Sequence, residues 1–326
     1  MKTILTSPIE EKCAWFGNDI INNNDWIIRL DDYLLSVLDA AHQHITNLGK
    51  KAPHFNKDDI HIKDEKFLNF IDKISDQLEN GYGFIVIKGL DVKRFNEEEL
   101  IDIYYILGLY LGMPVTQNIQ QELLGYVENV GDVKNKQTRV YRTNANLPYH
   151  SDMSDVVGLL SIRKAKEGGE SSLVSFATVY NTILKEYPEY LAYYYHPAYY
   201  NHLGEDEPSL SPIFSYWEGK LACRYLRQYI EVGHERKNIP LSRVQKDALN
   251  IFDEISHRNE LRINMILEPG DIQLCNNYIV MHSRTSFVDY DEIDKNRKLV
   301  RLWLKMPNAR QLAPDFPGRN GFSSIS

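Results

Sequence analysis

Apolar residues recur at helical spacing in several long stretches of the chain. Apolar side chains at positions i, i+3, i+4 and i+7 form one face of an α-helix, which packs against a core. This pattern predicts amphipathic helices at residues 25–46, 64–80, 96–114, 178–195 and 242–257. Asn96 is the expected N-cap of the third helix, and Pro114 lies beyond its end.

Short extended runs dominate the rest of the chain. FIVIKGL (84–90) is β-branched and aromatic and predicts a buried strand. From about residue 123, similar runs alternate with glycine, proline or polar turns, which is typical of a sandwich or barrel. They are LLGYVENV, TRVYRT, VVGLLSIRKA, SSLVSFATVY, RINMILE, DIQLCNN, YIVMHSRTSF and KLVRLWLKM.

These elements together predict an α+β fold with a jelly-roll core. We expect one domain over residues 1–326. Its parts are an N-terminal helical layer at about 1–80, the core at about 81–310 with a helical insert at about 178–257, and a C-terminal tail at 311–326, whose last residues, GRNGFSSIS, look frayed. The tyrosine-rich stretch at 187–200 could line a pocket, but a packed helix is the simpler interpretation.

Composition narrows the function classes. The chain has 326 residues, 43% of them hydrophobic and 25% charged, as in a globular protein, and no apolar run approaches the length of a membrane span. The net charge of −8 argues against binding to a nucleic-acid backbone. Three widely spaced cysteines form neither a disulfide framework nor a zinc-ribbon pattern, and the N-terminus makes a poor signal peptide, so we expect a cytoplasmic protein.

The segment LPYHSDMSD (147–155) contains a candidate metal site. His150 and Asp152 are two apart in an apparently extended stretch, so both side chains can reach one ion. The best third ligand is His282, in a distant run of strand character. Two imidazoles and one carboxylate leave three metal positions open, as in non-haem Fe(II) oxygenases. Taken alone, the His150/Asp152 pair could be accidental, and His282 alone could be a hydrogen-bonded core histidine. A structural zinc site would be expected to include a cysteine ligand, and no cysteine lies next to these residues in the sequence.

Arginines follow His282 on the next predicted strand. Arg297 and Arg301 are four apart and share one face of that strand. A buried arginine needs an anion, and a bidentate arginine suits the far carboxylate of 2-oxoglutarate. The alternative for Arg297 is a surface ion pair with Glu292 or Asp294, and Arg301 could equally form a structural ion pair.

Three further polar residues lie near the predicted third ligand. Arg284 shares a strand face with His282 and has no assigned role. Asn276 and Asn277 are expected to cap or orient the backbone near the metal rather than to contact substrate.

Ordered motifs over roughly residues 80–310 resemble the taurine dioxygenase/clavaminate synthase-like family of Fe(II)/2-oxoglutarate-dependent oxygenases. They are GFIVIKGL (83–90), LPYHSD (147–152), GGESSLVS (168–175), EPGDIQLCNNYIVMHSRT (268–285) and RKLVRLWL (297–304). The resemblance implies a double-stranded β-helix core. It also implies that iron is bound by His150, Asp152 and His282.

The same resemblance implies roles for other side chains. Arg297 would pair with the distal carboxylate of 2-oxoglutarate, assisted by Ser171, or by Ser172 if the register differs by one. Arg301 would contact an acidic group on the substrate.

The implied activity is a dioxygenase that uses Fe(II), 2-oxoglutarate and O₂. It would hydroxylate an unactivated C–H bond of a small, acidic or amino-acid-like substrate and release succinate and CO₂. Asp152 fills the position that halogenating relatives leave open for chloride, so halogenation is disfavoured. Desaturation, cyclisation and a non-catalytic metal-binding role remain alternatives, as does a homo-oligomeric state. A zinc hydrolase would need a general base, and the sequence nominates none.

Overall fold

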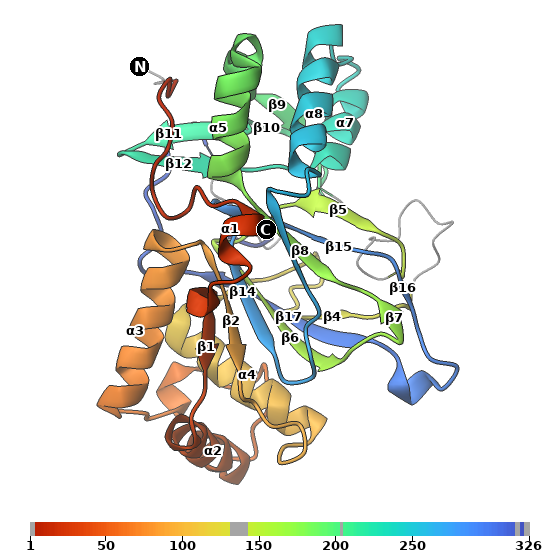
Figure 1. Ribbon diagram of the computed structural model, residues 1–326. Helices are drawn as coiled ribbons and strands as arrows, with labels where there is room; N and C mark the ends of the chain where they lie inside the picture. Colours follow the sequence, from red (N-terminus) through yellow and green to blue (C-terminus); the bar gives the residue numbers. More distant parts are fainter. Residues whose placement is uncertain (1–3, 131–142, 203–204, 317–319, 323–326) are drawn as a thin grey trace.

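Two β-sheets packed face to face form the centre of the molecule (Figure 1). The computed structural model describes residues 4–130, 143–202, 205–316 and 320–322. The major sheet has the strand order β1 (Ile27–Arg29), β2 (Phe84–Lys88), β14 (Ile272–Asn276), β6 (Val156–Arg163), β17 (Lys298–Lys305) and β3 (Met113–Pro114), and β4 (Leu124–Val127) also pairs with β17. The minor sheet has the order β13 (Arg262–Met265), β8 (Ser171–Ser175), β15 (Val280–Arg284) and β5 (Leu147–His150). The predicted α+β jelly roll is confirmed.

The central strands of the major sheet, β2, β14, β6 and β17, are buried on both faces. On β2, Ile85 packs in the cluster with the N-terminal helices, whereas Val86 packs in the cluster between the sheets. On β17, Val300 and Leu302 face the helices and Trp303 faces the minor sheet. Because successive strand residues point to opposite faces, burial of both faces explains why these segments read as near-continuous apolar runs.

Two helices, α3 (Glu65–Asn80) and α4 (Glu97–Leu111), cover the outer face of the major sheet, and α2 (Asp32–Asn47) packs against both of them. Asn96 caps α4 through a capping box with Glu99, as expected from the sequence. The helix packs so closely on β6 that a Cβ atom at Gly158 would lie 2.4 Å from the Tyr104 hydroxyl oxygen. The predicted helix at 64–80 is confirmed, and the one at 96–114 ends at Leu111, before β3.

Two predicted elements are wrong at their boundaries. Residues 27–29 belong to β1, which pairs in parallel with β2, and the helix begins only after Asp31, whose side chain accepts a hydrogen bond from the Leu34 amide. The run SSLVSFATVY is a strand only to Ser175. The Ser175 hydroxyl then accepts from the Thr178 amide and starts α5.

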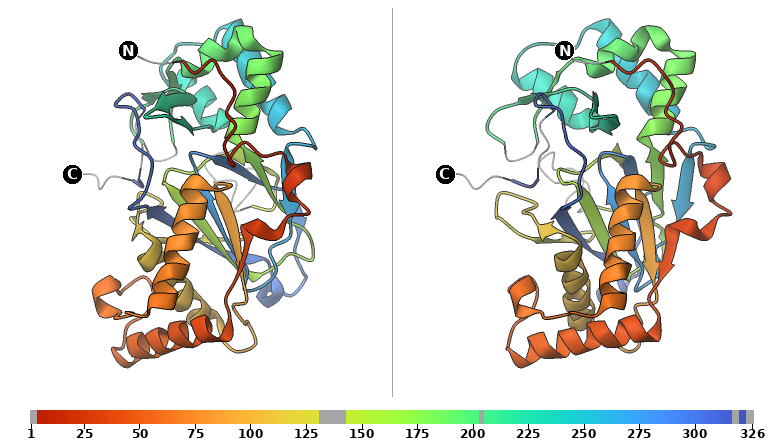
Figure 2. Two further views of the ribbon diagram at one scale, coloured as in Figure 1. Left: turned by 60° about the vertical axis from the view of Figure 1, so that its left-hand side comes forward. Right: turned by 90° about the vertical axis from the view of Figure 1, so that its left-hand side faces the viewer.

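The insert forms a separate layer at one end of the two sheets, opposite α2 (Figure 2). Its helices are α5 (Phe176–Glu186), α6 (Leu191–Tyr195), α7 (Arg227–Arg236) and α8 (Arg243–Ser256), and its strands are β9 (Ala198–Tyr200), β10 (Ser209–Ser211), β11 (Phe214–Trp217) and β12 (Lys220–Cys223). The sequence pattern missed α7 and these strands, and the predicted helix at 178–195 is broken by the 3₁₀ turn η4 (Pro188–Tyr190). Tyr194 and Tyr200 are fully buried in the insert core, as the simpler interpretation expected.

Several short elements complete the fold: α1 (Gly17–Ile20), η1 (Asn24–Trp26), η2 (Lys57–Asp59), η5 (Ile293–Lys295) and the strand pair β7 (Glu167–Gly168) and β16 (Phe287–Val288). In the described parts of the chain, no helix is long and apolar enough to cross a membrane. The predicted strand TRVYRT lies outside the described residues except for its last position. The prediction of a frayed C-terminal tail is wrong for residues 320–322. The Gly321 amide donates a hydrogen bond to the Met153 carbonyl, and the Phe322 ring stacks on Trp303.

Candidate metal centre

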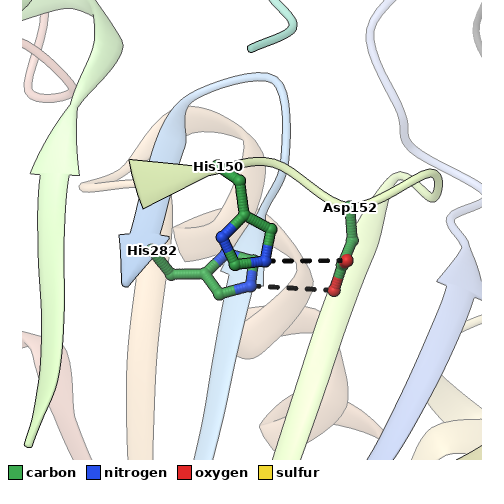
Figure 3. A group of neighbouring side chains, drawn as sticks. All are labelled: His150, Asp152 and His282. Carbon is green, nitrogen blue, oxygen red and sulfur yellow. Dashed lines mark ion pairs between the residues drawn. The ribbon is translucent and has the colours of Figure 1, made fainter. Parts of the chain in front are cut away.

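His150, Asp152 and His282 come together where β5 ends beside β15 (Figure 3). His150 Nε2 lies 4.0 Å from Asp152 Oδ1, and His282 Nε2 lies 3.7 Å from Asp152 Oδ2. The two imidazole centroids are 4.2 Å apart. One ligand atom from each residue lies within 4.8 Å of the others, so a single ion can contact all three.

Strand pairing and the turn after β5 position these side chains. His282 on β15 is the direct cross-strand partner of His150, the last residue of β5. The chain then leaves the sheet, because the Ser151 amide donates to the Tyr225 carbonyl. Asp152 therefore lies in a loop and not, as the sequence suggested, on a continuing strand.

Asn277 fixes this loop by hydrogen bonds in both directions. Its Oδ1 accepts from the Asp152 amide at 2.9 Å, and its Nδ2 donates to the Ser154 carbonyl at 3.0 Å. The predicted backbone-orienting role of Asn277 is thus confirmed. Asn276 acts farther away, since its Nδ2 donates to the Leu78 carbonyl at the end of α3.

Burial favours the neutral form of both histidines. Burial lowers the pKa of His150, and burial together with the neighbouring His150 lowers the pKa of His282 to about 3. His150 Nδ1 lies 2.8 Å from the Pro148 carbonyl oxygen, which can only accept, so Nδ1 carries the proton and Nε2 presents a lone pair. Neutral imidazole is the form that binds metals.

Asp152 is ionised and held by partners on β17. Burial opposes its ionisation, but the positive charge of Arg301 and the hydrogen bond from Trp303 favour it, and the pKa of Asp152 is lowered. Arg301 Nη1 lies 3.6 Å from Oδ1, and Trp303 Nε1 donates to Oδ2 at 3.0 Å. The sequence analysis missed Trp303, although its position two residues after Arg301 was a usable signal, because both side chains share one strand face.

These residues fit a bound divalent metal. The lone pair of His150 Nε2 faces a carboxylate oxygen of Asp152, and two acceptors that face each other at 4.0 Å repel unless a cation lies between them. Two neutral imidazoles and a carboxylate are borderline ligands that suit iron and leave room for further ligands.

A cavity extends from the two histidines and is strongly basic at its walls. The described residues that line it include no Asp or Glu. They are Val127, Leu147, His150, Leu159, Ser171, Leu267, His282, Ser283, Arg284, Arg297, Leu299 and Arg301. The cavity therefore favours anionic ligands.

Arg297 is buried in this cavity and not paired at the surface. It is 6% exposed, and burial lowers its pKa to about 9. Glu292, one of the surface partners considered above, pairs with Lys295 instead. Arg297 Nη1 is buried with no hydrogen-bond acceptor. Such an arrangement is costly unless an anion enters the cavity.

Strand register distinguishes the two candidate serines. Ser171 lines the cavity, and its hydroxyl donates to Gln273 Oε1 at 2.7 Å. Ser172 points to the other face, where its hydroxyl bonds with Asn264 Oδ1 and the Tyr149 hydroxyl. Only Ser171 can therefore contact a ligand in the cavity.

Arg301 has features of both roles considered for it. It lines the cavity, and it also approaches Asp152 and donates from Nε to Gln117 Oε1 at 2.7 Å. Gln117 lies in a segment without a recognisable motif, so the sequence gave no indication of this contact.

Comparisons with known proteins agree with this geometry. The model of the family "Taurine catabolism dioxygenase TauD, TfdA family" matches residues 45–303. FR-33289 synthase of Streptomyces rubellomurinus is 31% identical over 321 residues, covering 95% of this chain and 94% of that protein. The taurine hydroxylase-like protein SAT17 of Stachybotrys chartarum is 24% identical, covering 91% of this chain and 80% of that protein.

Solved structures share the fold at low sequence identity. An asparagine oxygenase superposes with a TM-score of 0.64 at 16% identity, covering 91% of this chain and all of that one. The non-haem iron oxygenase OrfP superposes with a TM-score of 0.63 at 12% identity, covering 86% of this chain and 94% of that one. The family match spans most of the chain, including all three residues of the triad. The chain therefore belongs to the taurine catabolism dioxygenase TauD, TfdA family.

Proposed function

We propose that this protein is an Fe(II)- and 2-oxoglutarate-dependent dioxygenase that hydroxylates an unactivated C–H bond of a small, amino-acid-like or acidic substrate. One observation carries the proposal: three metal-ligand side chains and a set of buried arginines line or adjoin the same cavity. The proposal treats residues 1–326 as one oxygenase domain.

Different residues of the cavity would bind the metal, bind the co-substrate and exclude water. His150, Asp152 and His282 would hold Fe(II), which when bound supplies O₂ activation coupled to the conversion of 2-oxoglutarate to succinate and CO₂. Arg297 and Ser171 would hold the distal carboxylate of 2-oxoglutarate at the other end of the cavity. Leu147, Leu159 and Leu299 line the space between and exclude water from it.

The ligands of the structural relatives support an amino-acid-like substrate. The asparagine oxygenase structure contains Fe(II), 3-hydroxyasparagine and succinate. Structures of OrfP contain iron with alpha-ketoglutaric acid and iron with L-Arg. In the present chain, Arg301 is the proposed contact for an acidic group of the substrate, because it lies on the cavity wall beside Asp152.

Other outcomes of the same site are less well supported. Asp152 occupies the position that halogenation would need free, so hydroxylation is favoured. A zinc hydrolase would need a general base near the metal-bound water, and the described cavity walls contain no carboxylate for that role. Desaturation and cyclisation use the same ligands and are distinguished by product mass.

The test is turnover by the Fe(II)-loaded protein with 2-oxoglutarate, O₂ and a panel of amino acids and small acids. We expect one substrate to stimulate succinate formation and to yield a product heavier by one oxygen atom. A product lighter by two hydrogen atoms would identify desaturation or ring closure. Absence of any iron-dependent succinate formation, with iron shown to be bound, would contradict the proposal and favour a non-catalytic metal-binding protein.

We further propose a cytoplasmic location and a small-molecule substrate without nucleic-acid or membrane partners. Cys13, Cys223 and Cys275 are free thiols, and the latter two are buried, as is usual in a reducing compartment. Size-exclusion chromatography with light scattering would determine whether the protein forms a homo-oligomer.

A further inference from the structure

Arg284 lies in the same cavity as the metal ligands and has no part in the function proposed above. On β15 it is two residues after His282, so the two side chains point to the same face of the strand. Across the sheet it is paired with Ser171 on β8. Directly opposed residues of antiparallel strands also share a face. Arg284 therefore stands at the end of the cavity where Ser171 and Arg297 lie.

The Arg284 guanidinium is only partly used by protein groups. Its Nη2 donates to the carbonyl oxygens of Thr143, at 2.9 Å, and Ala145. Nε and Nη1 are buried without an acceptor, as is Nη1 of Arg297. Among the described residues, Asp289 is the carboxylate whose charge acts on both guanidinium groups, but its oxygens accept hydrogen bonds from the Arg297 amide and from Asn129 Nδ2.

A shared aromatic ring keeps the two guanidinium groups close together. The guanidinium carbon of Arg284 lies 4.7 Å from the Phe287 ring centroid, and that of Arg297 lies 5.1 Å from it. The charge of Arg284 acts on Arg297 more strongly than the opposing charge of Asp289 does. An anion that enters beside the two guanidinium groups would therefore stabilise them and would supply acceptors for their three unpartnered nitrogens.

We propose that Arg284 is a second binding residue for the distal carboxylate of the 2-oxo acid, beside Arg297. This inference rests on the proposed function. The Nη2 contacts with Thr143 and Ala145 give Arg284 a further, positioning role, because these carbonyls belong to the segment that leads into β5 and His150. The remaining N–H groups are charge-assisted donors for the carboxylate.

The test separates carboxylate binding from tethering by using two co-substrates. 2-Oxoglutarate and 2-oxopentanoate have the same chain length and the same metal-binding end, but 2-oxopentanoate lacks the distal carboxylate. Both would be titrated calorimetrically into Fe(II)-saturated protein under argon, for wild type, Arg284→Gln and Arg284→Lys. Arg310→Gln is a matched control, because Arg310 is also buried, donates to a carbonyl and has an unpartnered Nε, but lies outside the cavity walls.

We expect Arg284→Gln to weaken 2-oxoglutarate binding about 10- to 100-fold and 2-oxopentanoate binding by less than about twofold. Arg284→Lys, which keeps the charge, should retain more of the preference for 2-oxoglutarate, and it serves as the test if the Gln variant does not fold. Arg310→Gln should retain the preference fully.

Two results would overturn the role proposed for Arg284 and leave the proposed function intact. One is an unchanged preference for 2-oxoglutarate in both Arg284 variants. The other is an equal loss for both ligands, which would mean that Arg284 only tethers the segment before β5. A wild-type protein that binds 2-oxoglutarate no better than 2-oxopentanoate would instead overturn the assigned co-substrate, and with it the proposed function.

Discussion

Trp303 should strengthen metal binding through a single hydrogen bond to the carboxylate ligand. Its Nε1 donates to Asp152 Oδ2 at 3.0 Å, while its ring packs between Arg301, 4.8 Å from the ring centroid, and Phe322. Trp303→Phe removes the donor and keeps an aromatic ring, so the packing is largely preserved. The perturbation therefore isolates the orientation of Asp152.

The expected magnitude follows from the type of bond. A hydrogen bond to a charged group contributes about 1.5–3 kcal/mol, but the bond exists both with and without metal, so only part of it appears in metal affinity. Loss of a residue that orients a metal ligand typically lowers metal affinity about 10- to 100-fold. We expect Trp303→Phe to fall near the lower end, about tenfold, because Arg301 still approaches Asp152 at 3.6 Å.

The assay is a Mn(II) titration followed by electron paramagnetic resonance, which reports free metal directly. Trp26→Phe is the matched control, since Trp26 is buried and its Nε1 donates to the Ile20 carbonyl at 3.1 Å, away from the triad. The control should bind Mn(II) as wild type does. Wild-type affinity in the Trp303→Phe variant, or an equal loss in both variants, would refute the reasoning.

Three further substitutions probe the cavity, a buried carboxyl group and the helix–sheet contact. Gly169→Ala should weaken 2-oxoglutarate binding in a calorimetric titration. The backbone φ of +71° at this position disfavours a side chain by about 1–2 kcal/mol, and the new Cβ would lie 3.1 Å from Arg297 Nε. Unchanged affinity for 2-oxoglutarate would contradict this prediction. Burial raises the pKa of Asp102 above its ordinary 3.8, so its folded form prefers the proton, and the stability that it contributes at low pH is lost as the pH rises through the raised pKa. Chemical denaturation from pH 3 to 7 should therefore show Asp102→Asn gaining stability relative to wild type as the pH increases, whereas a constant difference would exclude the pKa shift. Gly158→Ala should lower the free energy of unfolding by about 1–3 kcal/mol, since its Cβ would lie 2.4 Å from the Tyr104 hydroxyl oxygen, and a wild-type denaturation midpoint would show that α4 can move.

Local signals in the sequence were sufficient for much of the fold, and the triad was predicted from the order of several motifs together. Capping residues such as Asn96 act on their own helix, so the start of α4 could be predicted without tertiary information. The order of the family motifs identified His150, Asp152 and His282, whereas the strand alternation assumed for Asp152 does not hold, because this residue lies in a loop. Their convergence in the structure agrees with that prediction.

Other features of the fold and the site depend on contacts between residues far apart in the sequence, and local sequence patterns could not predict them. Residues 27–29 form β1 because they pair with β2, about 60 positions later, and helical spacing does not report such pairing. Asp152 lies outside the strand because the preceding Ser151 amide donates a hydrogen bond to the carbonyl of Tyr225 in the insert. The unpartnered nitrogens of Arg284 become meaningful only once the register of β8 and β15 is known.

Formation of the co-substrate complex tests the central claim most directly. Metal-free protein would be titrated anaerobically with Fe(II) and then with 2-oxoglutarate, while the visible charge-transfer absorption of the chelate is recorded for wild type and Arg297→Ala. We predict a band in wild type that needs far more 2-oxoglutarate in the variant, because the buried Arg297 cation meets the distal carboxylate. Bound iron without any such band, in a protein whose His150, Asp152 and His282 are intact, would contradict the assignment of this cavity to 2-oxoglutarate.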